Sequence, residues 1–166
     1  TFLQAAFAHL PLRTADELAI GHPDPMYREM ADAGADHPYW KAADHSAAVP
    51  KAPPASFTSG WYDLFLDDLL DDFLAQQAAG KRPYLTVGPW NHLDMGYLPV
   101  AFGDGLAWFD TYLKGKANKL RKKPVRLYVM GADRWRTFDK WPPPADMHPL
   151  YLHGSGAAKT GRLRWD

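Results

Sequence analysis

The sequence predicts an α/β fold built on a parallel sheet with helical crossovers. Two short strand-like runs are separated by an amphipathic helix, and a further helix follows the second run. This succession of strand, helix, strand and helix is typical of parallel strands that are joined by helices. Short helices precede this region, and a β-rich pattern follows it from Pro124 onward.

Composition excludes several classes of function. Of the 166 residues, 46% are hydrophobic and 14% aromatic, which is enough to build a core. The 19 basic and 19 acidic residues balance, so we expect no nucleic-acid partner, because such proteins carry a basic surplus or a dense basic face. The absence of cysteine excludes disulfides and thiol catalysis. No apolar run approaches the roughly 18 residues of a membrane span, so we expect no membrane partner; the compartment stays open.

Residues 1–50 are predicted to form short helices. Asp24-Pro25 indicates a helix start with proline in the first turn, and Thr14 with Glu17 has the spacing of a capping box. Prolines at positions 50, 53 and 54 then interrupt the pattern. We therefore expect a boundary at residue 50.

Residues 51–118 are predicted to supply the strands and helices of the sheet. Strands are expected at 55–59 and 83–88, and a helix at 104–114 with Gly115 as its cap. The clearest helix is 64–79, which ends at Gly80 and has aspartates on the side that is predicted to face solvent. Its apolar stripe consists of Leu66, Leu69, Leu70, Phe73 and Leu74.

Residues 119–166 are predicted to open an all-β module. The runs 125–130 and 150–153 are β-rich, with turn residues and no helical period between them. The stretch from Lys114 to Lys123 contains six basic residues, both ends included. In a chain of zero net charge, we interpret this basic run as a solvated linker rather than as a site for an anionic partner.

Two motifs near the strand ends carry the candidate chemistry. They are Gly60-Trp61-Tyr62-Asp63 and Gly88-Pro89-Trp90-Asn91-His92. Neighbouring parallel strands lie about 5 Å apart, so Asp63 and His92 can meet at one edge of the sheet. There Asp63 would accept the Nδ1–H of His92, and Nε2 would exchange a proton with a nucleophile. A separation above about 5 Å would argue against such a pair.

Both residues also have a purely structural interpretation. Asp63 could cap the following helix, and His92 could be a polar loop residue. The order aspartate then histidine calls for a serine on an earlier Gly-x-Ser-x-Gly turn, and no such turn is present. The four serines, Ser46, Ser56, Ser59 and Ser155, lie outside that motif, and we reject them as nucleophiles.

Metal and cofactor chemistry are not expected. The pairs Asp36-His37 and Asp44-His45, and His92 with Asp94, offer possible ligands. None has His-Glu-x-x-His spacing or a comparable cluster, and no glycine-rich phosphate loop is present. We therefore predict neither a metal ion nor a cofactor.

The two motifs resemble those of the cocaine esterase and X-prolyl dipeptidyl peptidase-like family of serine α/β-hydrolases. Trp108–Gly115 is similar to the helix that follows the histidine in that family, and Pro124–Pro144 to the passage into its C-terminal β-sandwich. The clear resemblance covers residues 59–154, and His37–Trp40 fits the end of a helical cap. It implies a cap segment at 1–50, the C-terminal part of the hydrolase sheet at 51–118 and the start of a jelly roll at 119–166.

The resemblance also implies a function. It implies hydrolysis of an ester or amide through an acyl-serine intermediate, as in an esterase, an acylase or an X-Pro dipeptidyl peptidase. Asp63 and His92 match the acid and base of the triad, and Phe65 matches an aromatic that lines the acyl pocket. Trp61 and Trp90 would wall the site. Core packing is the alternative interpretation for these three aromatics.

The chain departs from the family pattern in what it lacks. The serine turn and the upstream part of the oxyanion hole are absent, and the β-sandwich breaks off near Asp166. The first residue is Thr1 rather than methionine. We therefore expect a fragment that is inactive alone and whose partners are the rest of its parent chain and a small ester, amide or short peptide. The alternatives are a non-catalytic binding module and a split or degenerate half of a hydrolase.

Overall fold

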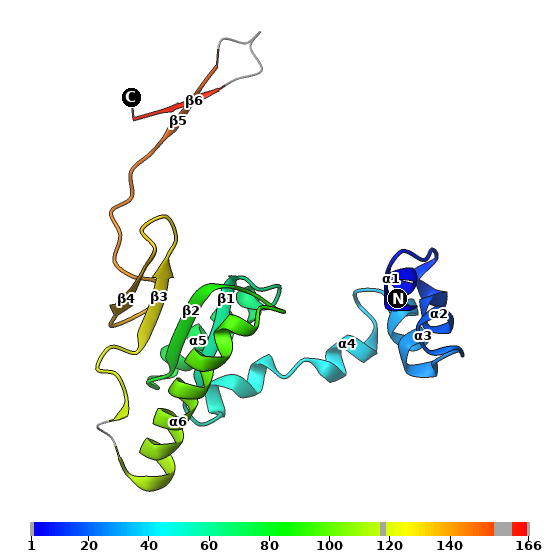
Figure 1. Ribbon diagram of the computed structural model, residues 1–166, viewed down its shortest axis with the longest axis horizontal. Coiled ribbons are helices and arrows are strands. Elements are labelled where there is room, and N and C mark those ends of the chain that lie inside the picture. Colours follow the sequence, from blue (N-terminus) through cyan, green and yellow to red (C-terminus); the bar gives the residue numbers. More distant parts are fainter. Residues whose placement is uncertain (1, 117–118, 155–160, 166) are drawn as a thin grey trace. The chain divides into compact units, whose positions relative to one another are not determined.

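The computed structural model describes residues 2–116, 119–154 and 161–165 (Figure 1). The chain divides into two compact units, residues 1–53 and residues 54–166. Within the described ranges, no helix combines the length and the apolar character that crossing a membrane requires.

The first unit consists of short helices. They are α1 (Phe2–Phe7), α2 (Ala15–Ile20), α3 (Pro25–Asp32) and α4 (Pro38–Ala43), with 3-10 turns at Leu12–Thr14 and Ser46–Lys51. The predicted start of α3 is confirmed, because the Asp24 side chain accepts the Tyr27 N–H at 2.7 Å. The predicted capping box at Thr14 is wrong. The neighbouring Asp16 accepts the Glu17 N–H at 2.9 Å instead.

Asp16 links the helices of this unit. Its side chain is buried, and Oδ2 accepts the Asp24 N–H at 2.8 Å and Arg28 Nε at 3.0 Å. The Arg28 bond is the main cause that lowers the pKa of Asp16 to about 2, against the opposing effect of desolvation. One carboxylate therefore joins α2, the loop before α3 and α3 itself.

The second unit contains a four-stranded sheet in the order β1-β2-β3-β4 (Figure 1). Its strands are β1 (Ser56–Tyr62), β2 (Tyr84–Asn91), β3 (Val125–Val129) and β4 (Arg134–Phe138). β1, β2 and β3 are parallel, and β4 is antiparallel to β3. The α/β fold and the parallel pairing of the first two strands are thus confirmed. Both strands are longer than predicted, so most of each motif lies inside its strand.

The two long helices, α5 (Leu66–Ala78) and α6 (Leu98–Lys114), pack on opposite faces of this sheet. Phe73 of α5 is buried in one cluster with Leu85 and Val87 of β2. On α6, Asp104 accepts a hydrogen bond from the hydroxyl of Thr86 at 2.7 Å. Because successive residues of a strand face opposite sides, odd and even positions of β2 contact different helices.

Helix α6 is longer than predicted and leaves its expected apolar side uncovered. It begins at Leu98 with proline in its first turn, and a 3-10 turn (Met95–Tyr97) precedes it. Gly103 and Gly105 lie inside the helix, so they do not mark its start. Trp108 is its buried residue, whereas the side formed by Leu106, Phe109 and Leu113 is exposed.

The sequence predicts that an all-β module opens with the residues of β3, but this strand continues the parallel sheet of the second unit. It pairs in parallel with β2, and the N–H of Leu85 donates to the carbonyl of Pro124 at 3.0 Å. Leu85 and Val125 are both fully buried, which favours this pairing. Farther on, β5 (Tyr151–His153) and β6 (Arg162–Arg164) form a separate antiparallel pair. A jelly roll stays a prediction.

Candidate active site

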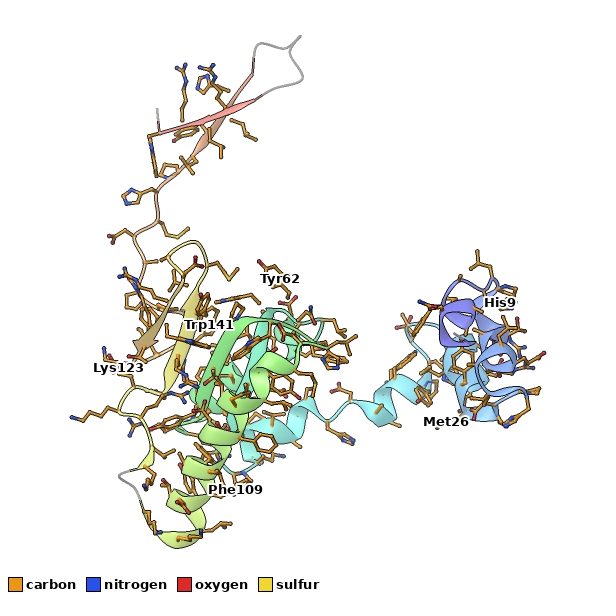
Figure 2. The ribbon with its side chains drawn as sticks, viewed as in Figure 1. His9, Met26, Tyr62, Phe109, Lys123 and Trp141 are labelled. Carbon is orange, nitrogen blue, oxygen red and sulfur yellow. The ribbon has the colours of Figure 1, made fainter. Side chains whose placement is uncertain are left out.

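Asp63 and His92 lie at the same edge of the sheet, directly after the paired strands β1 and β2. Tyr62, labelled in Figure 2, is the last residue of β1, and Asn91 is the last residue of β2. Asp63 Oδ1 lies 3.2 Å from Nδ1 of His92, within hydrogen-bonding distance. The Asp63 side chain is 15% exposed and that of His92 is 47% exposed. The two motifs therefore place a shielded carboxylate next to an accessible imidazole.

A tight turn holds the Asp63 carboxylate in place. The N–H of Asp63 donates to Gly60 O at 3.0 Å, and Oδ1 accepts the N–H of Phe65 at 3.0 Å. Helix α5 begins only at Leu66, after this turn, so the side chain of Asp63 is not its N-cap. Desolvation raises the pKa of Asp63, but the Phe65 N–H and the His92 ring outweigh it and hold the pKa below its ordinary value.

Phe65 contacts the imidazole rather than the hydrophobic core. Its ring meets the His92 ring edge-on, with centroids 5.0 Å apart at 75°. The side chain is 52% exposed, which excludes the alternative of a helix core residue. Phe65 thus limits the movement of the imidazole and presents an apolar surface beside it.

A small cleft of about 160 Å³ opens at this edge. It is lined by Thr58, Ser59, Gly60, Asp63, Trp90, Asn91, His92 and Tyr97. Sequence reasoning did not place Ser59 or Tyr97 here. For Ser59 a signal was available, because it lies in the first strand, four residues before Asp63. Tyr97 follows the histidine motif in a 3-10 turn, and no sequence pattern points to it.

The Ser59 hydroxyl is buried beside the Asp63 carboxylate. Its Oγ has no hydrogen-bond partner of normal geometry among the described residues, although it contributes weakly to the lowered pKa of Asp63. Buried hydroxyls are rarely left unpaired. The Ser59 hydroxyl therefore lies in the cleft next to the carboxylate and favours its ionised form.

The two tryptophans of the motifs lie in different surroundings. Trp61 donates its indole N–H to Tyr128 O at 2.7 Å and packs on the hydrophobic cluster near Trp141, which is labelled in Figure 2. Trp90 is 8% exposed and lines the cleft, with its ring 5.7 Å from that of Trp135. Trp61 therefore joins β1 to β3, and only Trp90 borders the cleft.

The remaining serines and the possible metal ligands do not extend this site. Ser46 belongs to the first unit, Ser56 begins β1, and Ser155 lies outside the described residues. Among the residues that the structure describes, no three His, Asp or Glu side chains come together as metal ligands. The site of the second unit is thus a carboxylate–imidazole pair with aromatic neighbours.

The geometry of this pair permits acid–base chemistry. With its proton on Nδ1, the ring of His92 donates to Asp63 and leaves Nε2 free to accept a proton. A carboxylate in this position fixes the tautomer and stabilises the imidazolium that forms. The pair can therefore accept a proton from a hydroxyl and return it to a leaving group.

Comparison with known proteins connects this geometry to a family. A model of the family described as X-Pro dipeptidyl-peptidase (S15 family) matches residues 4–94. Cocaine esterase of Rhodococcus sp. (strain MB1 Bresler) is 39% identical over 126 residues, which are 66% of this chain and 22% of that protein. The chain thus spans about a fifth of the length of this curated relative.

A solved structure shares the fold. The crystal structure of an aminopeptidase from a marine sediment archaeon, Thaumarchaeota archaeon, superimposes with a TM-score of 0.54 and 23% sequence identity. The match covers 77% of this chain and 23% of that one. At this identity, the likeness concerns the fold alone.

Proposed function

The chain belongs to the X-Pro dipeptidyl-peptidase (S15) family of serine esterases and peptidases, and from this premise we propose that Asp63 and His92 are the acid and the base of a catalytic triad. The observation that carries the proposal is the 3.2 Å contact between Asp63 Oδ1 and His92 Nδ1 at the ends of adjacent parallel strands. This distance lies well inside the roughly 5 Å beyond which a preformed pair would be doubtful.

The parent protein hydrolyses an ester or amide through an acyl-serine intermediate. Nε2 of His92 takes the proton of a serine hydroxyl as its oxygen attacks the carbonyl carbon, and then protonates the leaving group. Water attacks the acyl-serine in the second half of the reaction, again with His92 as base. Throughout, Asp63 accepts the Nδ1–H and stabilises the imidazolium.

The nucleophile comes from outside these 166 residues. No serine of the chain occupies a Gly-x-Ser-x-Gly turn, and the chain corresponds to 22% of the length of the Rhodococcus esterase. The substrate is a small ester, amide or short peptide, bound partly against the exposed ring of Phe65 next to the imidazole. The contact between Asp63 and His92 favours this proposal over a non-catalytic binding module, because binding alone does not require a carboxylate–imidazole pair.

The decisive experiment uses the full-length parent protein. We expect turnover on a panel of aryl esters and X-Pro anilides, and we expect His92→Ala to abolish it. The relative kcat/KM on the two substrate types distinguishes an esterase from a dipeptidyl peptidase. His37→Ala in the first unit serves as the matched control. Undiminished turnover by a correctly folded His92→Ala protein would refute the proposal.

A further inference from the structure

The strands β1 and β2 change register just before the catalytic pair. Gly60 pairs with Gly88, and the next pair is Tyr62 with Asn91. One residue of β1 lies between these pairs, whereas two residues of β2, Pro89 and Trp90, lie opposite it. Such a β-bulge shifts every later residue of the longer strand by one position. Continued one residue past the strands, this register brings Asp63 level with His92; without the bulge, Asp63 would be level with Asn91.

Gly60 accommodates the backbone of the bulge. A Cβ at this position would lie 2.0 Å from the carbonyl oxygen of Trp90 and 2.6 Å from its carbonyl carbon. These are backbone atoms of a paired strand, so they cannot rotate away as the end of a side chain can. Pro89 fits the same bulge because proline has no N–H to donate to the ladder. The bulge therefore requires glycine at position 60.

Gly88 accommodates the indole of the bulge residue. A Cβ at this position would lie 2.2 to 2.4 Å from three carbons of the Trp90 ring. The ring is held on its other sides, with centroids 5.7 Å from Trp135 and 6.4 Å from Tyr97. Trp90 is 8% exposed, so it has little room to turn. The indole thus fits closely over Gly88 and keeps Trp90 in its bulged position.

We infer that Gly60, Gly88 and Trp90 form a register clamp, a set of positioning residues that sets His92 level with Asp63. The clamp fixes the bulge from two directions, through the backbone of Trp90 against Gly60 and through its indole against Gly88. Trp90 then acts mainly through the geometry of His92 rather than as a wall for substrate. The catalytic consequence rests on the proposed function, whereas the effect on the Asp63–His92 contact does not.

The first test replaces each glycine by alanine in the full-length parent protein. Gly60→Ala and Gly88→Ala are expected to lower kcat by at least about 10²-fold, because a misplacement of about 1 Å has that effect on catalysis. KM is expected to change little. Gly103→Ala is the matched control: a Cβ there meets nothing within 4 Å, and alanine suits a helix interior better than glycine. Its kcat should equal that of the wild type.

A double-mutant cycle with Trp90→Ala separates the two contacts. Gly88→Ala clashes with ring atoms that alanine at position 90 lacks, so it should cause no further loss in the Trp90→Ala background. Gly60→Ala clashes with backbone atoms that every residue at position 90 has, so its full loss should persist there. If Gly60→Ala prevents folding, the cycle between positions 88 and 90 decides alone. Additive losses at positions 88 and 90 would overturn the clamp.

A spectroscopic signal distinguishes positioning from general destabilisation. In protein labelled with ¹⁵N-histidine, the Nδ1 proton of His92 should give a low-field signal that disappears in Asp63→Asn. The same signal should disappear in folded Gly60→Ala and persist in Gly103→Ala. If it persists in folded Gly60→Ala with unchanged kcat, the clamp is wrong. If His92→Ala retains activity, the proposed function fails, and the clamp is still judged by this signal.

Discussion

A single carboxylate oxygen of Asp63 serves two partners. Oδ1 accepts the N–H of Phe65 at 3.0 Å and faces Nδ1 of His92 at 3.2 Å. The first contact fixes the turn before α5, and the second orients the imidazole. The prediction that Asp63 caps the helix is wrong, because its side chain accepts an N–H of the turn before α5; that bond and the contact with histidine occur together. Because Phe65 stabilises the ionised form, the carboxylate is charged before any substrate arrives.

We predict that Asp63→Asn in the parent protein lowers kcat by about 10⁴-fold, because an amide no longer holds the imidazole in the productive tautomer. The amide oxygen can still accept the Phe65 N–H, so the turn and the melting temperature should change little. Steady-state kinetics on an aryl ester measures the loss. Asp67→Asn, in the exposed first turn of α5, is the control and should keep the wild-type kcat. A loss below tenfold would contradict the role of Asp63.

At the scale of elements, the sequence predicted what local chemistry determines. The stripe of α5 and the proline start of α3 were recognised because periodicity and capping act within a few residues. The Asp63–His92 pair was recognised because parallel strand ends meet at one edge. The bulge in β2 was not, because it depends on Trp90 fitting over glycines of two strands. The pairing of β3 with β2 was not predicted either, because the sequence of an apolar strand does not specify which strand it pairs with.

Helix α6 is joined to the sheet by an ionic cluster on Asp104. Its Oδ2 accepts from Arg121 at 3.1 Å and from Arg126 at 2.8 Å, in addition to Thr86. The three charged side chains are only 14%, 19% and 25% exposed. Arg121 also donates to the carbonyl of Leu85, so the cluster reaches the backbone of β2.

We predict that Asp104→Asn lowers the free energy of unfolding by about 3 kcal/mol, because it leaves two largely buried guanidinium groups without their counter-charge. Chemical denaturation followed by circular dichroism measures the change. Asp110→Asn on the same helix is the matched control. It breaks a more exposed pair with Lys114, and such pairs contribute about 0.3 to 0.5 kcal/mol. Equal losses in the two variants would show that the Asp104 cluster does not stabilise the sheet.

The helices of the first unit should depend on pH through Asp16. Its pKa is about 2 in the folded state, against 3.8 as its ordinary value. Its contribution to stability is therefore complete above pH 3.8 and is lost as the pH falls through 2. The measurement is the rate of hydrogen exchange at amides 15–32. The ratio of this rate in Asp16→Asn to the rate in the wild type should fall towards one as the pH falls through that window. Asp32→Asn, which breaks an exposed pair with Arg13, is the control. Its ratio of exchange rates to the wild type should be smaller than that of Asp16→Asn above pH 3.8.

At the scale of the whole molecule, the second unit exposes a row of large apolar side chains on helix α6. Phe102, Leu106, Phe109 and Leu113 follow one another at helical spacing along α6, and each is at least 58% exposed. Contiguous exposed apolar surfaces of this kind usually mark contacts with other protein. This agrees with the proposal that the chain works as part of a longer hydrolase.

The same proposal predicts that the 166-residue chain alone does not react with a fluorophosphonate probe, whereas the parent protein does. The probe reports an activated serine, and activation requires the hydroxyl to lie within reach of His92 Nε2. Ser59 is the serine to test, because its buried hydroxyl lines the same cleft as Asp63 and His92. Labelling of the isolated chain that disappears in both His92→Ala and Ser59→Ala would make Ser59 the nucleophile and would refute the external serine. Labelling of the parent should survive Ser59→Ala and be lost in His92→Ala, because in our proposal the reactive hydroxyl belongs to another part of that protein.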